Sequence, residues 1–311
     1  MIKSLKLLLK YQLKNPVKTK NLGFTLIELL VGLILAVLII TPMLTFMVNL
    51  LDTDNKEQAK TSTEQEISAS IDYINKDLQQ AFYIYGPVST TDARPAIYAQ
   101  LPSVQPTTGC SNTSECTPII AFWKKKFMEN SIPIVSGTNC STANVVCHDT
   151  YVDSLVVYYR ITETNPTTWS KSGRIARFEI QEGVKGFTGS YVSPNDSTTG
   201  RPTSGSATST SRDLGFQTYS IAGEGTTDEK MNLWTKKTGE NYTTPVTVLV
   251  DNIESFTFTR NADNSGTIAI TGNALARLNS NPPACTNDSI YCPKATLRVK
   301  NLGFLNTTNN N

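Results

Sequence analysis

The sequence predicts an α+β protein in which a long N-terminal helix packs on an antiparallel β-sheet. Residues 29–51 form an apolar run without a formal charge, and a helical pattern then continues to about residue 85. Beyond residue 86 the chain instead alternates branched and aromatic residues with polar ones, as strands do. A long helix followed by a run of strands is typical of α+β domains.

The N-terminal region is expected to enter a membrane. Residues 1–23 contain six lysines and no acid, whereas the remainder has 22 Lys and Arg against 26 Asp and Glu, a formal charge of −4. As a helix, the 23 residues from Leu29 to Leu51 would span the roughly 30 Å hydrocarbon core of a bilayer. Lysines before the run and acids after it predict a cytoplasmic N-terminus and an extracytoplasmic remainder.

Two simpler interpretations of this run are a cleaved secretory signal peptide and a plain membrane anchor. A conventional signal has a shorter apolar region followed by a small-x-small cleavage site. Here the run is followed by DTDNKEQAK, which contains no such site. The signal peptide is therefore disfavoured, and a plain anchor leaves the single carboxylate within the apolar stretch, Glu28, unexplained.

The helical pattern continues past the apolar run. Apolar residues recur at three- and four-residue spacing, as on one face of a helix: Ile67, Ile71, Ile74, Leu78, Ala81 or Phe82, and Tyr85. Gly86-Pro87 is expected to end the helix, so 52–85 forms its amphipathic half. Gly32 and Pro42, in the apolar half, are the weak points of the helix, and a kink or local melting is expected near the proline.

The remaining residues, 86–311, are expected to form an extracytoplasmic β-rich head. Strand-like segments are 151–162, 173–182, 244–261, 266–272 and 295–301. Their alternation predicts an antiparallel sheet with one face buried. Residues 193–215 are rich in Ser, Thr and Gly and are expected to form a mobile surface loop.

Six cysteines lie beyond the membrane run, in a compartment that favours disulfides. They allow 15 connectivities, and nearest neighbours close the shortest loops. The expected pairs are Cys110 with Cys116, Cys140 with Cys147, and Cys285 with Cys292. A zinc site is disfavoured because no C-x2-C occurs and His148 is the only histidine.

The segment GFTLIE, Gly23 through Glu28, follows the basic leader and opens the apolar helix. This combination resembles the class III signal of type IV pilins and type II secretion pseudopilins. The resemblance implies cleavage between Gly23 and Phe24 by a membrane prepilin peptidase, and N-methylation of Phe24. The leader 1–23 would be removed, and 24–51 would become the transmembrane half of the helix.

The chemistry of each position is consistent with this resemblance. Glycine lets a protease approach the backbone closely, and cleavage creates a cationic amine on Phe24. In a filament, Glu28 of one subunit is expected to pair with that amine of a neighbour, because lipid would penalise either charge alone. The pentapeptide KNLGF recurs at 300–304 without an apolar helix after it, so the signal lies in the conjunction of leader, glycine, glutamate and helix.

Residues after the membrane run show a less specific resemblance. The stretches IDYINKDLQQA and VTVLVDNIESFTFTR, with a late ATLRVK strand, resemble larger minor pseudopilins related to the J component of type II secretion and the W-type minor pilins. The chain is most similar to cyanobacterial hormogonium polysaccharide secretion pseudopilins. A bulky head also favours a tip or sparse position in the filament.

The resemblance implies a function in secretion, with polysaccharide as the expected cargo, or in gliding or twitching motility. Implied partners are other major and minor pilins, the prepilin peptidase, an inner-membrane assembly platform, and membrane lipid before assembly. Implied locations are the inner membrane and then an extracellular filament. No cofactor, metal or nucleic acid is expected.

Several functions from different classes stay open beside this one. A DNA-uptake pilin would need a basic stripe, and its nearest candidate, the run Lys124, Lys125 and Lys126, is interpreted as a solvated charge run. An adhesive or carbohydrate-contacting head stays possible. An anchored enzyme is disfavoured because common catalytic motifs are missing. The segment 261–266, NADNSG, lacks EF-hand spacing and is interpreted as a hairpin turn rather than a calcium site.

Overall fold

The computed structural model describes two compact units, Met1–Asp54 and Asn55–Asn311. The described residues are 23–85, 101, 115–135, 140, 144–163, 166, 168–184, 231, 246–260, 265–286 and 289–300. The expected loop at 193–215 lies outside them. Helix α2, Leu26–Gln79, contributes residues to both units.

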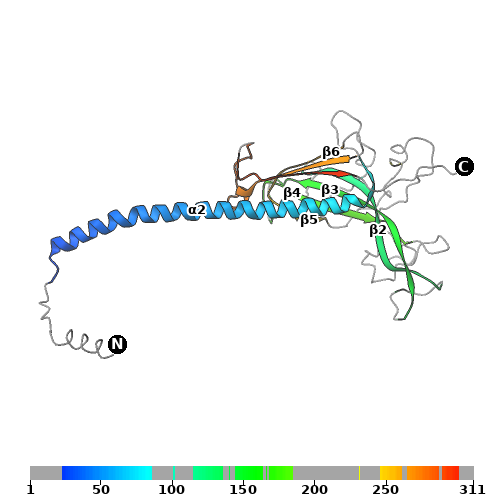
Figure 1. The fold of residues 1–311 in the computed structure, drawn as a ribbon, viewed down its shortest axis with the longest axis horizontal. Helices are drawn as coiled ribbons and strands as arrows, with labels where there is room; N and C mark the ends of the chain where they lie inside the picture. The colour runs from blue at the N-terminus through cyan, green and yellow to red at the C-terminus, as the bar shows by residue number, and fades with distance from the viewer. Residues whose placement is uncertain are drawn as a thin grey trace, which may run out of the picture. The chain divides into compact units, whose positions relative to one another are not determined.

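The second unit contains two antiparallel sheets (Figure 1). The first has the strand order β1-β2-β3-β4-β5 and the second has the order β6-β7-β8. The described strands are β1 (Ala81–Ile84), β2 (Cys116–Pro133), β3 (Cys147–Ile161), β4 (Arg174–Gln181), β5 (Thr247–Val250), β6 (Ile253–Arg260), β7 (Ser265–Gly272) and β8 (Lys294–Lys300), with the 3-10 helix η3 (Ala274–Arg277) between the last two. The α+β fold class is confirmed.

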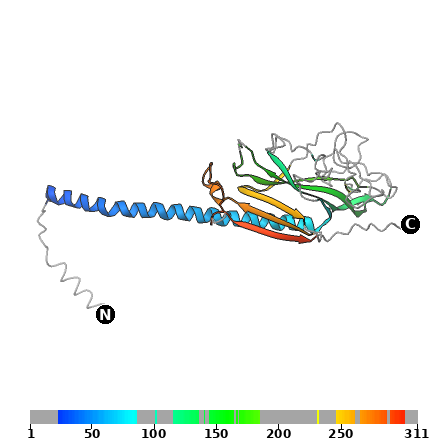
Figure 2. The ribbon, with the colours of Figure 1, turned by 90° about the horizontal axis from the view of Figure 1, so that it is seen from above.

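The C-terminal half of α2 packs beside both sheets (Figures 1 and 2). Its buried residues lie on one face: Ala59, Thr63, Ile67, Ser70, Ile71, Ile74, Asp77 and Leu78. The four large apolar members of this face share a core with side chains of β2, β3 and the three-stranded sheet. The apolar spacing predicted from Ile67 to Leu78 is therefore confirmed.

The expectation that one sheet face is buried is wrong for the five-stranded sheet. Residues 155–159 of β3 point alternately to the two faces, yet each is at most 2% exposed. The face away from α2 has a second core that includes Leu101 and Met231. There the hydroxyl of Tyr85 donates to the Met231 carbonyl at 2.8 Å and accepts from Trp123 Nε1 at 2.7 Å. The central strand is thus covered on both sides.

The helix ends earlier than predicted, at Gln79 rather than near residue 85. Residues 81–84 form β1 instead, with Tyr83 opposite Trp123 of β2. The helical spacing of Ala81 and Tyr85 suggested a longer helix. Pairing with β2 prevails here because aromatic and branched side chains favour a strand that has a partner.

The long strand expected over 244–261 is two strands in different sheets. β5 pairs with β4, whereas β6 pairs with β7. Between them Asn252 has φ = 60°, in the left-handed region that asparagine tolerates. This backbone turn redirects the chain from one sheet to the other. Beside it, Ile253 N–H donates to the Gly173 carbonyl at 2.8 Å, and a Cβ on Gly173 would lie 2.9 Å from the Ile253 carbonyl oxygen.

Strand β2 was not among the predicted strands, although it pairs with β3 along most of its length. Its sequence contains Pro118 and the run 124–126 of three lysines, both unusual in a central strand. Pro118 is tolerated because the register shifts immediately after it, between Pro118 and Ile120. The lysines have carboxylate partners, described below.

At the end of β7, Gly272 allows the three-stranded sheet to approach α2 closely. A Cβ on this glycine would lie 2.6 Å from Ile67 Cδ1 and 2.6 Å from Thr63 Cγ2. Any larger residue must push the helix and the strand apart or displace both side chains. The contact between α2 and this sheet therefore requires glycine at this position.

We expect Gly272→Val to lower the free energy of unfolding by about 1–3 kcal/mol, the usual cost of forcing extra methyl groups into a packed interior. Guanidinium unfolding of the full-length protein in neutral detergent, followed by tryptophan fluorescence, measures this change. Ala269→Val is the matched control, because Ala269 lies in the same strand between Thr257 and Thr296 on the opposite face. Equal midpoints for the two variants would contradict the close contact.

Candidate functional site

The start of α2 brings together the residues that resemble a processing signal. Gly23 and Phe24 precede the helix and are exposed. Thr25 caps the helix: its carbonyl accepts from Glu28 N–H at 3.1 Å and from Leu29 N–H at 3.2 Å, and its Oγ1 accepts from Glu28 N–H at 3.3 Å. Glu28 therefore occupies the first helical turn, where the helix dipole favours a negative charge.

Thr25 and Glu28 have the spacing of a capping box, T-x-x-E, which the sequence interpretation overlooked. That motif was visible in the sequence, but Glu28 was considered only as a charge within an apolar run. A threonine cap is worth about 0.5–2 kcal/mol to a helix. The sequence that resembles a cleavage signal also specifies where the helix begins.

The helix after this turn presents an apolar surface on every side. All side chains from Phe24 to Leu51 are exposed in the single chain, and Glu28 carries the only formal charge among them. The helix is long and apolar enough to cross a membrane. Such a surface needs lipid or protein to cover it, because contiguous exposed apolar area of this extent is rare on soluble monomers.

Gly32 and Pro42 lie inside α2, which continues through both without interruption. Local melting at Pro42 is thus not observed, because the residues on either side of it are helical. Immediately before it, Thr41 Oγ1 donates to the Val37 carbonyl at 2.8 Å, a bond that often accompanies helix bending. The expected kink itself stays a prediction.

Two of the three predicted disulfides lie within the described residues. Cys140 pairs with Cys147 and Cys285 with Cys292. Cys116 is also disulfide-bonded, but its predicted partner, Cys110, lies outside the described residues.

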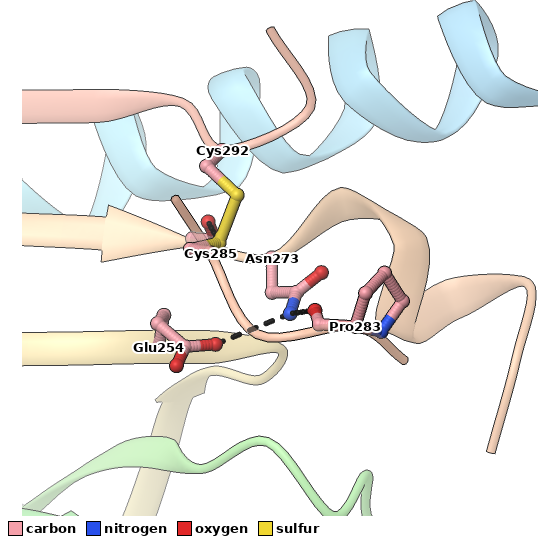
Figure 3. Close-up of a disulfide and its surroundings, with 6 residues drawn as sticks. Glu254, Asn273, Pro283, Cys285 and Cys292 are labelled. Atoms are coloured by element: carbon pink, nitrogen blue, oxygen red, sulfur yellow. Dashed lines mark hydrogen bonds between the residues drawn. A yellow bond between two sulfur atoms is a disulfide. The ribbon is translucent and has the colours of Figure 1, made fainter. Parts of the chain in front are cut away.

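The second disulfide closes a loop beside the end of β7. Asn273 lies close to it, and its amide nitrogen donates to Glu254 Oε2 at 3.1 Å and to the Pro283 carbonyl at 2.9 Å (Figure 3). Arg277 of η3 in turn donates from Nε to Thr63 Oγ1 of α2 at 2.9 Å and forms an ion pair with Glu66. The segment η3, which follows β7, is thereby joined to the helix.

The lysine run in β2 is only in part the solvated charge run that was expected, because Lys125 is exposed and Lys126 is partly exposed. Lys124 is buried, and its Nζ lies 2.7 Å from Asp77 Oδ1 in the last turns of α2. Lys125 pairs with Asp153 at 2.5 Å, and Lys126 with Glu179 at 3.4 Å. Each lysine thus has a carboxylate partner, which disfavours a nucleic-acid site here.

Asp77 is the centre of a buried polar network between the helix and the sheet. Besides Lys124, its carboxylate accepts from the Tyr158 hydroxyl at 2.6 Å and from Arg177 Nε at 2.7 Å. Arg177 also pairs with Glu179 at 2.7 Å. The donors come from β2, β3 and β4, so one helical carboxylate contacts three neighbouring strands.

The network determines the protonation of its members. Burial alone would raise the pKa of Asp77, but the hydrogen bond and charge of Arg177, with hydrogen bonds from Lys124 and Tyr158, hold that pKa below its usual 3.8. Burial also opposes ionisation of Glu179, whose pKa is nevertheless lowered by Arg177 and Lys126. Burial and the charge of Asp77 raise the pKa of Tyr158 well above its usual value, so its hydroxyl remains a donor.

The remaining catalytic and metal candidates have ordinary places in the fold. His148 lies in β3 opposite Ile132 of β2. Within the part of the chain that the structure describes, no group of three or more His, Cys, Asp or Glu could hold a metal ion. The turn expected at 261–266 joins β6 and β7, which pair as antiparallel neighbours, but 261–264 lie outside the described residues.

Comparison with protein-family models, curated protein sequences and solved structures finds no match in any of the three.

We expect Asp77→Asn to cost about 3–5 kcal/mol of stability at pH 7, because it leaves buried Lys124 without its carboxylate and Arg177 with Glu179 alone. Asp77 has a folded-state pKa below its unfolded value. Its contribution is thus complete above about pH 5 and is lost as the pH falls through the folded-state pKa. Guanidinium unfolding of both proteins between pH 7 and pH 2 measures the difference in unfolding free energy.

Asp72→Asn is the control, because Asp72 is an exposed carboxylate on the same helix. It should change stability by no more than about 0.5 kcal/mol. A difference between wild type and Asp77→Asn that stays constant down to pH 2 would contradict the assigned role of the ionised carboxylate.

Proposed function

We propose that this protein is a minor pseudopilin, a non-enzymatic subunit of a filament related to type IV pili and type II secretion pseudopili. The observation that carries the proposal is the conjunction at the start of α2. A basic leader ends at Gly23, a capped helix begins beside Phe24, and a single carboxylate precedes a charge-free apolar run. The same helix then supplies the buried face of an α+β head.

The proposed sequence of events begins in the inner membrane, with the basic leader in the cytoplasm. Prepilin peptidase cuts after Gly23, and the exposed chain around this residue supports such access: a Cβ on Gly23 would meet nothing within 4 Å. The new amine of Phe24 is then methylated. The mature chain passes from lipid into the filament with help from an assembly platform.

In the filament, neighbouring pilin helices would replace lipid around residues 24–51. Their apolar side chains are available on every side of the helix, which supports packing within a bundle. The carboxylate of Glu28 would pair with the Phe24 amine of a neighbouring subunit. Neither charge then remains alone in an apolar environment, and the pair specifies the axial register of the new subunit.

The filament is proposed to support secretion, with polysaccharide as the cargo, or gliding or twitching motility. A minor pilin for DNA uptake is the second candidate. The pairing of Lys124, Lys125 and Lys126 with carboxylates speaks against it, because counterion release requires cations that reach phosphates. An adhesive pilus subunit and an anchored enzyme remain less favoured, with no described feature that supports them.

The first test concerns processing. Gly23→Val should abolish cleavage, since the added side chain obstructs the peptidase, whereas a Cβ at this position meets nothing within 4 Å in the described chain. Intact-mass spectrometry of membrane-purified protein should find residues 1–311 uncut, against 24–311 with a methylated Phe24 in the wild type. Gly303→Val in the second KNLGF is the matched control and should be processed normally. Normal cleavage of Gly23→Val would refute the proposal.

The second test concerns assembly. Glu28→Ala should be cleaved normally but should enter filaments much less, because the Phe24 amine loses its partner. The measurement is the amount of the variant in sheared filament fractions relative to membrane fractions. Glu57→Ala removes an exposed carboxylate from the same helix and serves as the control. Undiminished incorporation of Glu28→Ala would exclude the pairing.

A further inference from the structure

The three-stranded sheet has one face in the core and one face in solvent. Ala295, Leu297 and Val299 of β8 pack on the core shared with α2, so the intervening residues of β8 point outward. We call the outward side the β8 face. Its members, taken from the strand register, are Ser255, Thr257 and Thr259 of β6, Ser265, Thr267, Ala269 and Thr271 of β7, and Lys294, Thr296, Arg298 and Lys300 of β8. Ser265 is buried, and Ser255, Thr267, Ala269 and Thr271 are half-buried, so the solvent-exposed part consists of the remaining six.

The β8 face is both hydroxyl-rich and basic. Its three charged members are all cations, namely Lys294, Arg298 and Lys300, and all are exposed. No acidic residue belongs to the face, although the chain after the leader has a net charge of −4. Arg298 Nε donates to Ser265 Oγ at 3.1 Å, which holds the guanidinium over the sheet. The remaining members are serine, threonine and one alanine.

This face contrasts with the lysines of β2. Each of Lys124, Lys125 and Lys126 has a carboxylate within 4.0 Å, whereas no ion pair joins Lys294 or Lys300 to a carboxylate of the described chain. The contiguous lysines of β2 stand out in the sequence, whereas β8 was predicted only as a strand. The β8 cations fall on alternate positions, so they share one face without being neighbours in sequence.

We propose that the β8 face binds a carboxylate-bearing polysaccharide, with the polymer lying along the strands. At about 3.3 Å per residue, the cations stand roughly 13 Å and 7 Å apart along β8. Sugar carboxylates would meet these cations, and sugar hydroxyls would bond the hydroxyl rows of β6 and β7, for example at Thr257. This assigns a polymer-binding surface and an acidic cargo, and its role in export rests on the proposed function.

Edge protection and nucleic-acid binding account for the β8 face less well. Lysines on an edge strand protect against pairing with another chain, but this role requires neither the absence of acids nor the hydroxyl rows on β6 and β7. Single-stranded nucleic acid is bound by cations combined with aromatic platforms for the bases, and no member of the β8 face is aromatic. Hydroxyls with spaced cations suit an acidic sugar polymer better.

The test measures binding of full-length protein in neutral detergent to immobilised polygalacturonate, neutral dextran and oligodeoxythymidylate. We expect binding to polygalacturonate that weakens as NaCl rises from about 20 to about 300 mM. Removing two exposed ion contacts in Lys294→Gln/Lys300→Gln should weaken it by about tenfold. The control Lys76→Gln/Lys171→Gln removes two exposed charges elsewhere and should stay within about twofold.

A second variant tests the hydroxyl rows. Thr257→Val/Thr296→Val keeps side-chain shape and β-propensity and should weaken polygalacturonate binding several-fold. Equal binding by wild type and Lys294→Gln/Lys300→Gln would overturn the proposal, as would binding of dextran or oligodeoxythymidylate as tight as that of polygalacturonate. Self-association of the lysine variant with unchanged polymer binding would assign the lysines to edge protection instead.

The result of the binding test can be distinguished from the result of the processing test, which bears on the proposed function. The uncleaved Gly23→Val protein should bind polygalacturonate like the wild type, because the β8 face is remote in sequence from the leader. Normal processing with no binding would refute the β8 proposal alone. Binding by a wild-type protein that is not cleaved after Gly23 would refute the pseudopilin proposal alone.

Discussion

The buried carboxylate of Asp77 is the interaction that the head depends on most. It receives hydrogen bonds from three neighbouring strands, so α2 cannot slide or rotate on the five-stranded sheet without breaking several of them. An ion pair in such a place is a weak source of net stability, because desolvation offsets much of the attraction. Its contribution is to orientation: the apolar stripe alone would tolerate other registers of the helix, whereas the carboxylate accepts only one.

The apolar contacts then follow from that placement. With α2 held at Asp77, Ile67 and Thr63 lie against Gly272, and the sheet can approach closely only because a Cβ is missing there. Around the same helical turns, Arg277 reaches Thr63 and Glu66 from η3, the 3-10 helix that follows β7. The helix is therefore fixed to the five-stranded sheet near its C-terminal end and to the three-stranded sheet further back. Residues before Ala59 have no buried face in the single chain.

Local patterns in the sequence predicted much of this fold. The stripe from Ile67 to Leu78, the strands β3, β4, β7 and β8, and two disulfides are each encoded within a short segment. The errors arose where distant residues decide the outcome. β1 has helical spacing but takes a strand partner about 40 residues later. The lysines of β2 resemble a solvated run because their carboxylate partners, Asp77, Asp153 and Glu179, are scattered along the chain. Only the fold brings the opposite charges together.

For Glu28, local structure stabilises the charge of the carboxylate by less than the full cost of placing that charge at the centre of a membrane helix. Its place in the first turn lets the helix dipole favour the carboxylate by about 0.3–1 kcal/mol. Insertion scales assign a charge a cost of about 2.5–3.5 kcal/mol at the centre of a membrane helix, and less near its ends. Capping by Thr25 positions the backbone but adds no positive charge. The dipole therefore offsets part of the cost, and in the function proposed here a cation close to Glu28 supplies the rest. An amine on Phe24 of an adjacent chain would meet that need, which is why cleavage and assembly are coupled in the function proposed here.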